Sequence, residues 1–213
     1  MKCEKETMLL YAVTDRMWTG RQTLLEQVED ALKGGVTCVQ LREKELDEAA
    51  FLQEAIAMKA LCAKYGVPFI VNDNVEIAIQ CKADGVHVGQ SDMAAGNVRA
   101  LVGEDMMIGV STRTVGQALA AQQAGADYLG VGAMFHTGTK LDAEEVSREM
   151  AQKITQAVDI PVVAIGGINE KNILELKGTG VDGVALVSAI FGAESIEEKC
   201  RTLRALSAEM IKA

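Results

Sequence analysis

Short apolar runs alternate with amphipathic segments along the whole chain, and this alternation constrains the fold more than any other feature of the sequence. A short run rich in Val, Ile, Leu and Ala predicts a buried strand, whereas apolar residues spaced three and four positions apart predict a helix. Strands are predicted at 8–15, 35–41, 68–71, 85–88, 107–110, 128–131, 161–165 and 181–187. Helices are predicted at 23–33, 47–63, 75–81, 97–102, 115–124, 143–158, 172–176 and 196–211.

Strict alternation of strands and helices requires parallel strands joined by right-handed crossovers. Eight strand–helix repeats within 213 residues are typical of an α/β protein with a single (β/α)8 TIM barrel. The alternative is an open doubly wound sheet. We favour the barrel because eight repeats close it and no GxGxxG motif follows the first strand. No linker interrupts the chain, so residues 1–213 are predicted to form one domain.

Charge and cysteine content restrict the possible partners. A net charge of −9 argues against binding to nucleic acid or to an anionic membrane. No apolar run is long enough to span a membrane, and the polar N-terminal segment is too short for a signal peptide. The five cysteines are scattered without a CxxC pair, which is typical of reduced thiols. These features predict a cytoplasmic protein, and they leave open whether it forms a homo-oligomer.

Polar residues gather where the predicted strands end. In a barrel these ends share one rim, where active sites are built. Gln40, Arg42 and Lys44 alternate, so in an extended chain they face one side and form a socket for a polar, anionic ligand. The alternative is an exposed strand end with solvated charges. The rim also receives Asn72, Asp73, Gln90, Asp92, Ser111, Thr137, Thr139, Lys140, Gly166, Gly167 and Ser188.

Three of these groups suggest specific ligands. Asp73 and Asp92 follow neighbouring strands and suit a hard cation such as Mg²⁺, although each Asp could instead cap the following helix. The Gly166-Gly167-Ile168 turn, expected to open a short helix, and the pair Val187-Ser188 lie where barrels bind phosphate; a plain tight turn is the alternative. The segment Thr137–Lys140 suits a lid over phosphate oxygens, or a solvated loop.

The two histidines are expected to differ. His87 lies within a strand between two valines, where hydrogen-bonded packing is its expected role. His136 lies on the predicted lid, where it could titrate usefully or simply be exposed. Trp18, on the first loop, could cover the site or pack on the surface.

Together these motifs resemble the thiamine-phosphate synthase family, and the likeness covers almost the whole chain in order. The matching segments are Tyr11–Asp15, Gln40–Lys44, Asn72-Asp73, Gly85–Asp92, Gly109–Ser111, Tyr128–Gly132, Thr137–Lys140 and Ala164–Ile168. The resemblance implies a transferase that joins a hydroxymethylpyrimidine diphosphate to a thiazole phosphate and releases pyrophosphate. Where the thiazole carries a carboxylate, CO₂ is also lost.

The resemblance also implies roles for individual residues. Arg42, Lys44, Ser111 and Lys140 would be catalytic, and Mg²⁺ would be bound by Asp73 and Asp92. The pyrimidine diphosphate would be bound by Gln40, Leu41, Arg42, Glu43, Lys44, Asn72, Ser111 and Lys140. The thiazole phosphate would be bound by Thr137, Gly138, Thr139, Gly167, Val187 and Ser188. Both partners are therefore phosphorylated small molecules.

One departure and two rival functions accompany the resemblance. The family usually has Pro-Ile-Phe-Pro where this chain has Ala133-Met134-Phe135-His136, and the loss of both prolines is expected to loosen the lid. A thiazole tautomerase on the same barrel is one alternative, because His136 could act as its acid or base. A non-catalytic phosphate-binding barrel is the other, although it would not need paired carboxylates.

Overall fold

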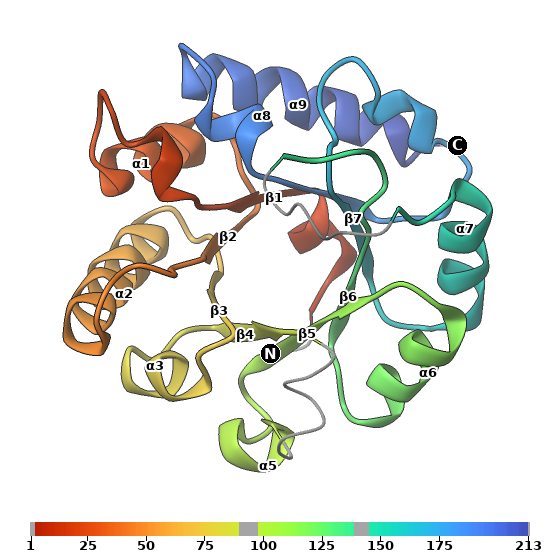
Figure 1. Cartoon of the computed structure of the whole chain (residues 1–213), viewed down its shortest axis with the longest axis horizontal. Coiled ribbons are helices and arrows are strands. Elements are labelled where there is room, and N and C mark those ends of the chain that lie inside the picture. Colours follow the sequence, from red (N-terminus) through yellow and green to blue (C-terminus); the bar gives the residue numbers. More distant parts are fainter. Residues whose placement is uncertain (1–2, 90–97, 139–144, 213) are drawn as a thin grey trace.

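The eight strands form a closed parallel barrel in which each strand pairs with its neighbours in sequence order. The structure, a computed structural model, describes residues 3–89, 98–138 and 145–212. In Figure 1 the strands form a ring, and the main helices lie outside it. The strands are β1 (Leu10–Val13), β2 (Cys38–Leu41), β3 (Phe69–Asn72), β4 (Gly85–Val88), β5 (Met107–Thr112), β6 (Tyr128–Val131), β7 (Val162–Ile165) and β8 (Gly183–Leu186). The predicted TIM barrel is confirmed.

The helices follow the predicted order, with additions at the short connections. Their bounds are η1 (Lys5–Met8), η2 (Arg16–Trp18), α1 (Leu24–Lys33), α2 (Glu48–Lys64), α3 (Val75–Gln80), α5 (Val98–Val102), α6 (Val115–Gln123), α7 (Arg148–Ala157), η3 (Ile173–Leu176), α8 (Ser188–Phe191) and α9 (Ile196–Met210). The 3-10 helices η1 and η2 and the short helix α8 were not predicted. Each is only three or four residues long, too short to leave a periodic apolar pattern.

Local capping sets where the longer helices begin. The Thr23 hydroxyl and the Glu26 carboxylate form a capping box at the start of α1. The predicted start of α7 at residue 143 is wrong, because residues 145–147 are irregular and the helix begins after Ser147. The Ser147 hydroxyl accepts a hydrogen bond from the Met150 N–H at 3.2 Å, which fixes that boundary.

The pleat of the barrel separates two apolar layers. Residues that point outward from the strands, such as Leu41, pack under the helices in the larger cluster. Inward-pointing residues form a second cluster inside the barrel, and η1 adds Met8 to it at the strands' amino ends. The inner cluster contains Met8, Tyr11, Val13, Cys38, Ile70, Met107, Tyr128, Val163 and Ala185. Each strand therefore directs alternate side chains toward the barrel axis.

Four equivalent hydrogen bonds close the amino end of the barrel. A side chain just before each even-numbered strand accepts the N–H of the first residue of the preceding odd-numbered strand, or of Ile108 in β5. These contacts are Thr37 Oγ1 to Leu10 N (2.9 Å), Asp84 Oδ2 to Phe69 N (2.8 Å), Asp127 Oδ2 to Ile108 N (2.8 Å) and Asp182 Oδ2 to Val162 N (2.9 Å). This end is therefore structural, and it lies opposite the polar rim.

Candidate active site

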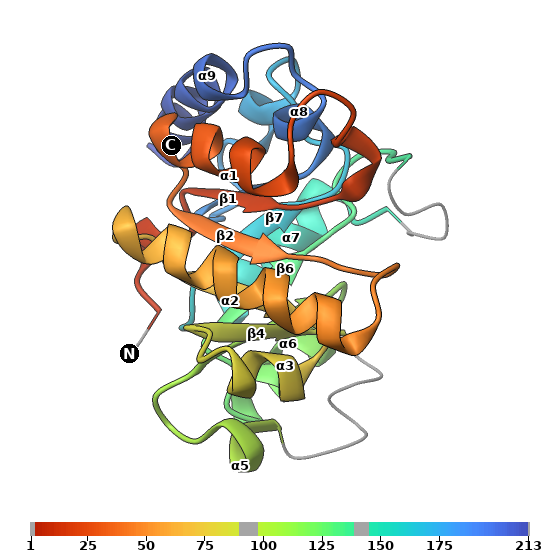
Figure 2. The same cartoon turned by 90° about the vertical axis from the view of Figure 1, so that its left-hand side faces the viewer.

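The carboxyl ends of the strands and the loops that follow them form the candidate site. Figure 2 shows the barrel from the side, with the arrowheads of β2 and β4 directed toward the same end and the chain's N-terminus at the other. Asp15, Arg42, Asp73 and Ser111 are all at or just after the ends of their strands. The parallel barrel thus brings them to one rim, as the sequence predicts.

The end of β2 supplies an amide and a guanidinium. Gln40 is buried, and its Nε2 donates to the Tyr11 hydroxyl at 2.7 Å. The Arg42 N–H donates to Thr14 Oγ1 at 3.0 Å, and its Nη1 lies 2.9 Å from Asp15 Oδ2. Asp15 therefore orients the Arg42 guanidinium at the rim, a partner that the sequence analysis missed.

The predicted alternation does not extend to Lys44. Strand β2 ends at Leu41, and Lys44 lies in an exposed bend beyond it. Lys44 thus lies on the loop after β2 rather than on the strand. The Leu41 side chain is fully buried in the outer cluster, so only its backbone can meet a ligand at the rim.

Glu43 organises the loop after β2. Its carboxylate accepts the N–H groups of Lys44 and Glu45, both at 2.8 Å, and pairs with Arg16, which also pairs with Glu54. Its side chain is only 1% exposed. Burial by itself raises the pKa of Glu43, but the backbone N–H groups and Arg16 lower that pKa below its usual value. The Glu43 carboxylate thus faces the protein and holds Lys44 in place.

The end of β3 carries Asp73, which is not the N-cap of the helix that follows. Asn72 Nδ2 donates to Asp73 Oδ2 at 2.6 Å, and the Asp73 N–H donates to the His87 carbonyl at 2.8 Å. Asp73 has a left-handed backbone, with φ of 60°. The cap of α3 is Asn74, whose Oδ1 accepts the Ile77 N–H at 2.9 Å. The helix-cap alternative is therefore wrong for Asp73, whereas Asp92 lies outside the described residues.

Oxygen donors suit a hard cation at this position. An Asp carboxylate oriented by an Asn amide is a ligand type that Mg²⁺ accepts, usually together with water and substrate oxygens. Within residues 3–89, 98–138 and 145–212, no group of three or more His, Cys, Asp and Glu side chains is arranged to hold a metal. The described part of the rim thus offers Asp73, and the second predicted carboxylate is the undescribed Asp92.

Ser111 lies at the rim and is linked to a series of buried, hydrogen-bonded side chains inside the barrel. His87 Nε2 lies 3.0 Å from Ser111 Oγ, and His87 Nδ1 lies 3.1 Å from the Tyr128 hydroxyl. The Tyr128 and Tyr11 hydroxyls are 2.8 Å apart. Burial lowers the pKa of His87 to about 4 and raises the pKa of both tyrosines, so all three groups are neutral near pH 7. The expected hydrogen-bonded packing of His87 is confirmed.

The tyrosines could have been found from the strand pattern. Tyr11 and Gln40 occupy inward positions of adjacent strands, as do His87, Ser111 and Tyr128. Alternation within one strand predicts which of its residues share a face. Applied from strand to strand around the barrel, the same alternation places these polar groups in one interior.

The 133–138 segment packs on the glycine turn after β7. Met134 N donates to Ile165 O at 2.9 Å, and Phe135 N donates to Gly166 O at 3.0 Å. Gly167 has φ of 65°, and a Cβ added there would lie 2.4 Å from the His136 carbonyl oxygen. No helix opens at Gly166, contrary to the prediction, because this turn is left-handed and η3 begins only at Ile173.

The remaining phosphate-site residues are partly described. Thr137 and Gly138 continue from the segment that lies on the Gly166-Gly167 turn, whereas Thr139 and Lys140 lie outside the described residues. Val187 packs against the inner cluster, and Ser188 is exposed at the start of α8. Trp18 packs near α8: a Cβ added to Gly192 would lie 3.2 Å from its ring. The Trp18 ring thus packs beside the end of α8.

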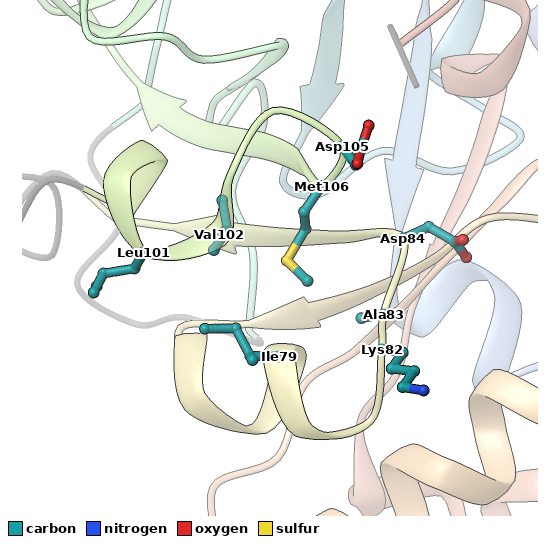
Figure 3. Close-up of a pocket in the computed structure, with 8 residues that line it drawn as sticks. All are labelled: Ile79, Lys82, Ala83, Asp84, Leu101, Val102, Asp105 and Met106. Carbon is teal, nitrogen blue, oxygen red and sulfur yellow. The ribbon is translucent and has the colours of Figure 1, made fainter.

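A pocket of about 300 Å³ lies elsewhere, between the ends of α3 and α5 (Figure 3). Its lining comes from segments that precede β4 and β5, which places it at the amino ends of these strands. It is therefore separate from the polar rim. The lining residues are Ile79, Lys82, Ala83, Asp84, Leu101, Val102, Asp105 and Met106. Among the described helices, none has the length and apolar character needed to cross a membrane.

Comparison with known proteins identifies the family of the chain. Residues 10–190 match the family model described as thiamine monophosphate synthase. Thiamine-phosphate synthase of Ruminiclostridium cellulolyticum is 50% identical over 194 residues, covering 91% of this chain and 92% of that protein. The synthase of Alkaliphilus oremlandii is 50% identical over 196 residues, covering 92% of this chain and 94% of that one.

A solved structure extends the likeness to three dimensions. Thiamine phosphate pyrophosphorylase from Pyrococcus furiosus superimposes with a TM-score of 0.88 and 37% identity, covering 97% of this chain and 98% of that one. The resemblance inferred from the motifs is thereby confirmed. The chain belongs to the thiamine monophosphate synthase family of transferases.

Proposed function

We propose that this protein couples 4-amino-2-methyl-5-(diphosphooxymethyl)pyrimidine with a thiazole phosphate, giving thiamine phosphate and pyrophosphate. One observation carries the proposal: Asp73 keeps its carboxylate at the rim, oriented by Asn72, while the neighbouring Asn74 caps the helix. A carboxylate arranged in this way suits a site that handles a diphosphate together with a divalent cation. The names of the relatives and the convergence of Arg42 and Ser111 on the same rim support it.

The chain's cations would act on the leaving group. Arg42, Lys44 and Lys140 bind the diphosphate oxygens, and Gln40, Asn72 and Ser111 contribute polar contacts. Loss of pyrophosphate separates charge along a carbon–oxygen bond, so fixed cations lower the barrier by stabilising charge that develops on the departing oxygen. The aminopyrimidine supports the resulting cation, which makes a dissociative step favourable. The thiazole nitrogen is the nucleophile, and no protein nucleophile is required.

Mg²⁺ is the proposed cofactor, held by Asp73 and Asp92. When bound, it supplies Lewis-acid stabilisation of the phosphate oxygens. The left-handed backbone of Asp73 and its hydrogen bond to the His87 carbonyl fix the carboxylate at the strand end. Asn72 holds one carboxylate oxygen at 2.6 Å, so the other is directed away from that amide.

The thiazole phosphate is assigned to the other side of the rim. Thr137, Gly138, Thr139, Gly167, Val187 and Ser188 would surround its phosphate. The contact between Gly167 and the His136 carbonyl supports this grouping, because it brings the loop after β6 to the turn after β7. Where the thiazole carries a carboxylate, the same coupling would also release CO₂.

The decisive experiment combines both substrates with Mg²⁺ and measures thiamine phosphate and pyrophosphate by mass spectrometry. We expect stoichiometric formation of the two products, and a matched reaction with EDTA should give neither. Interconversion of thiazole isomers without pyrophosphate would instead identify a tautomerase. Binding of either phosphate ligand with no turnover, and with no effect of EDTA on affinity, would identify a non-catalytic barrel.

A further inference from the structure

A chain of polar side chains crosses the apolar interior of the barrel, in addition to the rim contacts described above. It runs from Gln40 Nε2 to the Tyr11 hydroxyl (2.7 Å), on to the Tyr128 hydroxyl (2.8 Å), then to His87 Nδ1 (3.1 Å), and from His87 Nε2 to Ser111 Oγ (3.0 Å). The two ends, Gln40 and Ser111, are both residues proposed to bind the pyrimidine diphosphate. The three central residues have no assigned role.

Counting protons gives the chain a direction. The Gln40 amide nitrogen can only donate, so the Tyr11 oxygen accepts from it. In the arrangement that runs in one direction throughout, Tyr11 gives its one proton to the Tyr128 oxygen, and Tyr128 gives its one proton to His87 Nδ1. A neutral imidazole carries a single proton, so an accepting Nδ1 leaves that proton on Nε2. His87 therefore donates to Ser111 Oγ.

We infer that Gln40, Tyr11, Tyr128 and His87 form a one-way hydrogen-bond chain that fixes His87 as the Nε2–H tautomer and orients Ser111 as a donor. Because Ser111 Oγ accepts from His87, its own proton goes to an acceptor other than His87. In the coupling proposed above, on which this part of the inference rests, an oxygen or ring nitrogen of the pyrimidine diphosphate would be such an acceptor. Tyr11, Tyr128 and His87 are thus positioning residues.

Two strand glycines make the space that this chain occupies. A Cβ added to Gly109 would lie 2.1 Å from Tyr128 Cζ and 2.4 Å from His87 Nδ1. A Cβ added to Gly130 would lie 3.1 Å from His87 Cε1. Glycine inside a strand weakens it and commonly marks a close approach. Here both glycines admit the buried imidazole and phenol rings, which indicates that the barrel is built around the polar chain.

Burial makes the pattern of donors and acceptors obligatory. His87 is 9% exposed and Tyr11 is 1% exposed, so water cannot readily replace a missing partner. In such surroundings each hydrogen bond constrains the next, and a reversal at one end must pass along the whole chain. The direction of the hydrogen bond at Gln40 thereby determines the orientation of the Ser111 hydroxyl.

The first test needs neither substrate nor substitution. Nitrogen-15 NMR of the full-length protein labelled at histidine should show a protonated Nε2 and an unprotonated Nδ1 for His87 near pH 7. The signal is assigned as the one lost in His87→Gln. A protonated Nδ1 in the native protein would overturn the inference, and because no turnover is measured this result is independent of the proposed reaction.

The second test reverses the direction of the hydrogen bonds between Gln40 and Ser111. Gln40→Glu replaces the donor with a carboxylate that accepts from Tyr11, so the protons should shift and His87 should become the Nδ1–H tautomer. Tyr128→Phe should leave the tautomer unfixed and lower kcat, by up to about a hundredfold if Ser111 is misplaced. Met107→Leu, a size-conserving change in the same inner cluster, should alter neither. A folded Gln40→Glu variant that keeps the Nε2–H signal at a pH where its new carboxyl is ionised would refute the one-way chain.

Discussion

Asp73 lies directly before Asn74, and Asn74 rather than Asp73 caps the helix that follows. Asp is a favoured helix cap, yet here Asn74 caps α3 and Asp73 turns to the rim in a left-handed conformation. Asn tolerates this conformation about as well as Asp does, whereas most other residues are strained in it. A substitution with Asn therefore separates loss of charge from loss of fold.

We predict that Asp73→Asn lowers turnover at least about a hundredfold, as expected when stabilisation of charge in the transition state is lost. Its unfolding free energy should stay within about 1 kcal/mol of the wild type, because the backbone conformation is retained. Steady-state assays across a Mg²⁺ titration, together with urea denaturation, check both. A variant with normal turnover at low Mg²⁺ would remove Asp73 from the proposed metal site.

The buried His87 should couple stability to pH. Its folded-state pKa of about 4 lies below the ordinary value of 6.5, so only the unfolded chain takes up a proton between these values. Stability should therefore fall as the pH drops from 6.5 toward 4, by about 3 kcal/mol in all from this group. Urea denaturation over this range should show the loss, and His87→Gln should have a shallower dependence. Equal slopes in the two proteins would contradict the buried neutral imidazole.

At the scale of elements, the same contact between an Asp carboxylate and a strand N–H recurs at the amino end of the barrel. Asp84, Asp127 and Asp182 each accept an N–H from the preceding strand, and each also pairs with a cation on another segment. These cations are Lys59, Arg99 and Lys5 respectively. These ion pairs connect helices α2 and α5 and the start of the chain to the strands.

For this contact we predict that Asp127→Ala destabilises the protein by about 2–4 kcal/mol. The change leaves the Ile108 N–H and the Arg99 guanidinium without the carboxylate they share. Asp159→Ala, an exposed carboxylate in the connection before β7, should change stability by less than about 0.5 kcal/mol. Chemical denaturation of both variants is the measurement, and similar losses would show that the contact contributes little.

The glycine turn after β7 allows a matched pair of substitutions. Gly167→Ala should destabilise by about 1–3 kcal/mol, because the left-handed backbone is strained and the new Cβ meets the His136 carbonyl. Gly138→Ala should be nearly neutral, since a Cβ there meets nothing within 4 Å. Thermal denaturation distinguishes them. A stable Gly167→Ala variant would show that the 133–138 segment can move off the turn at little cost.

The elements also show what the sequence could and could not predict. The bounds of β4 and β6 are those predicted, since their apolar runs are bordered by residues that break strands. The predicted start of α7 is too early, because the charged residues before Ser147 resemble a first helical turn, and the Ser147 cap that ends this resemblance is not evident from the sequence pattern. The rim positions follow from strand order, and the inward tyrosines follow from the strand pattern once it is applied across the barrel. The Asp15–Arg42 pair depends on a contact between two loops that no local pattern encodes.

For the whole molecule, the burial of cysteine should report global unfolding. Cys38, Cys62 and Cys200 are fully buried, and burial raises the pKa of Cys62 and Cys200 to about 12. The thiolate is the reactive form, so these groups should resist thiol reagents in the native protein. Mass spectrometry during urea denaturation should show their labelling together with the loss of circular dichroism. Labelling of Cys38 before that transition would reveal local opening of the barrel.

Closure of the barrel joins the two ends of the sequence. Strand β1 pairs with β8, and the Ser207 hydroxyl of α9 donates to the Leu9 carbonyl, 198 positions away, at 2.6 Å. On a ribosome that adds about 5–20 residues each second, the free edge of β1 waits roughly 10–40 s for its last partner. An unpaired strand edge attracts other chains. Until β8 is made, the nascent protein therefore carries an edge at β1 that is open to such pairing.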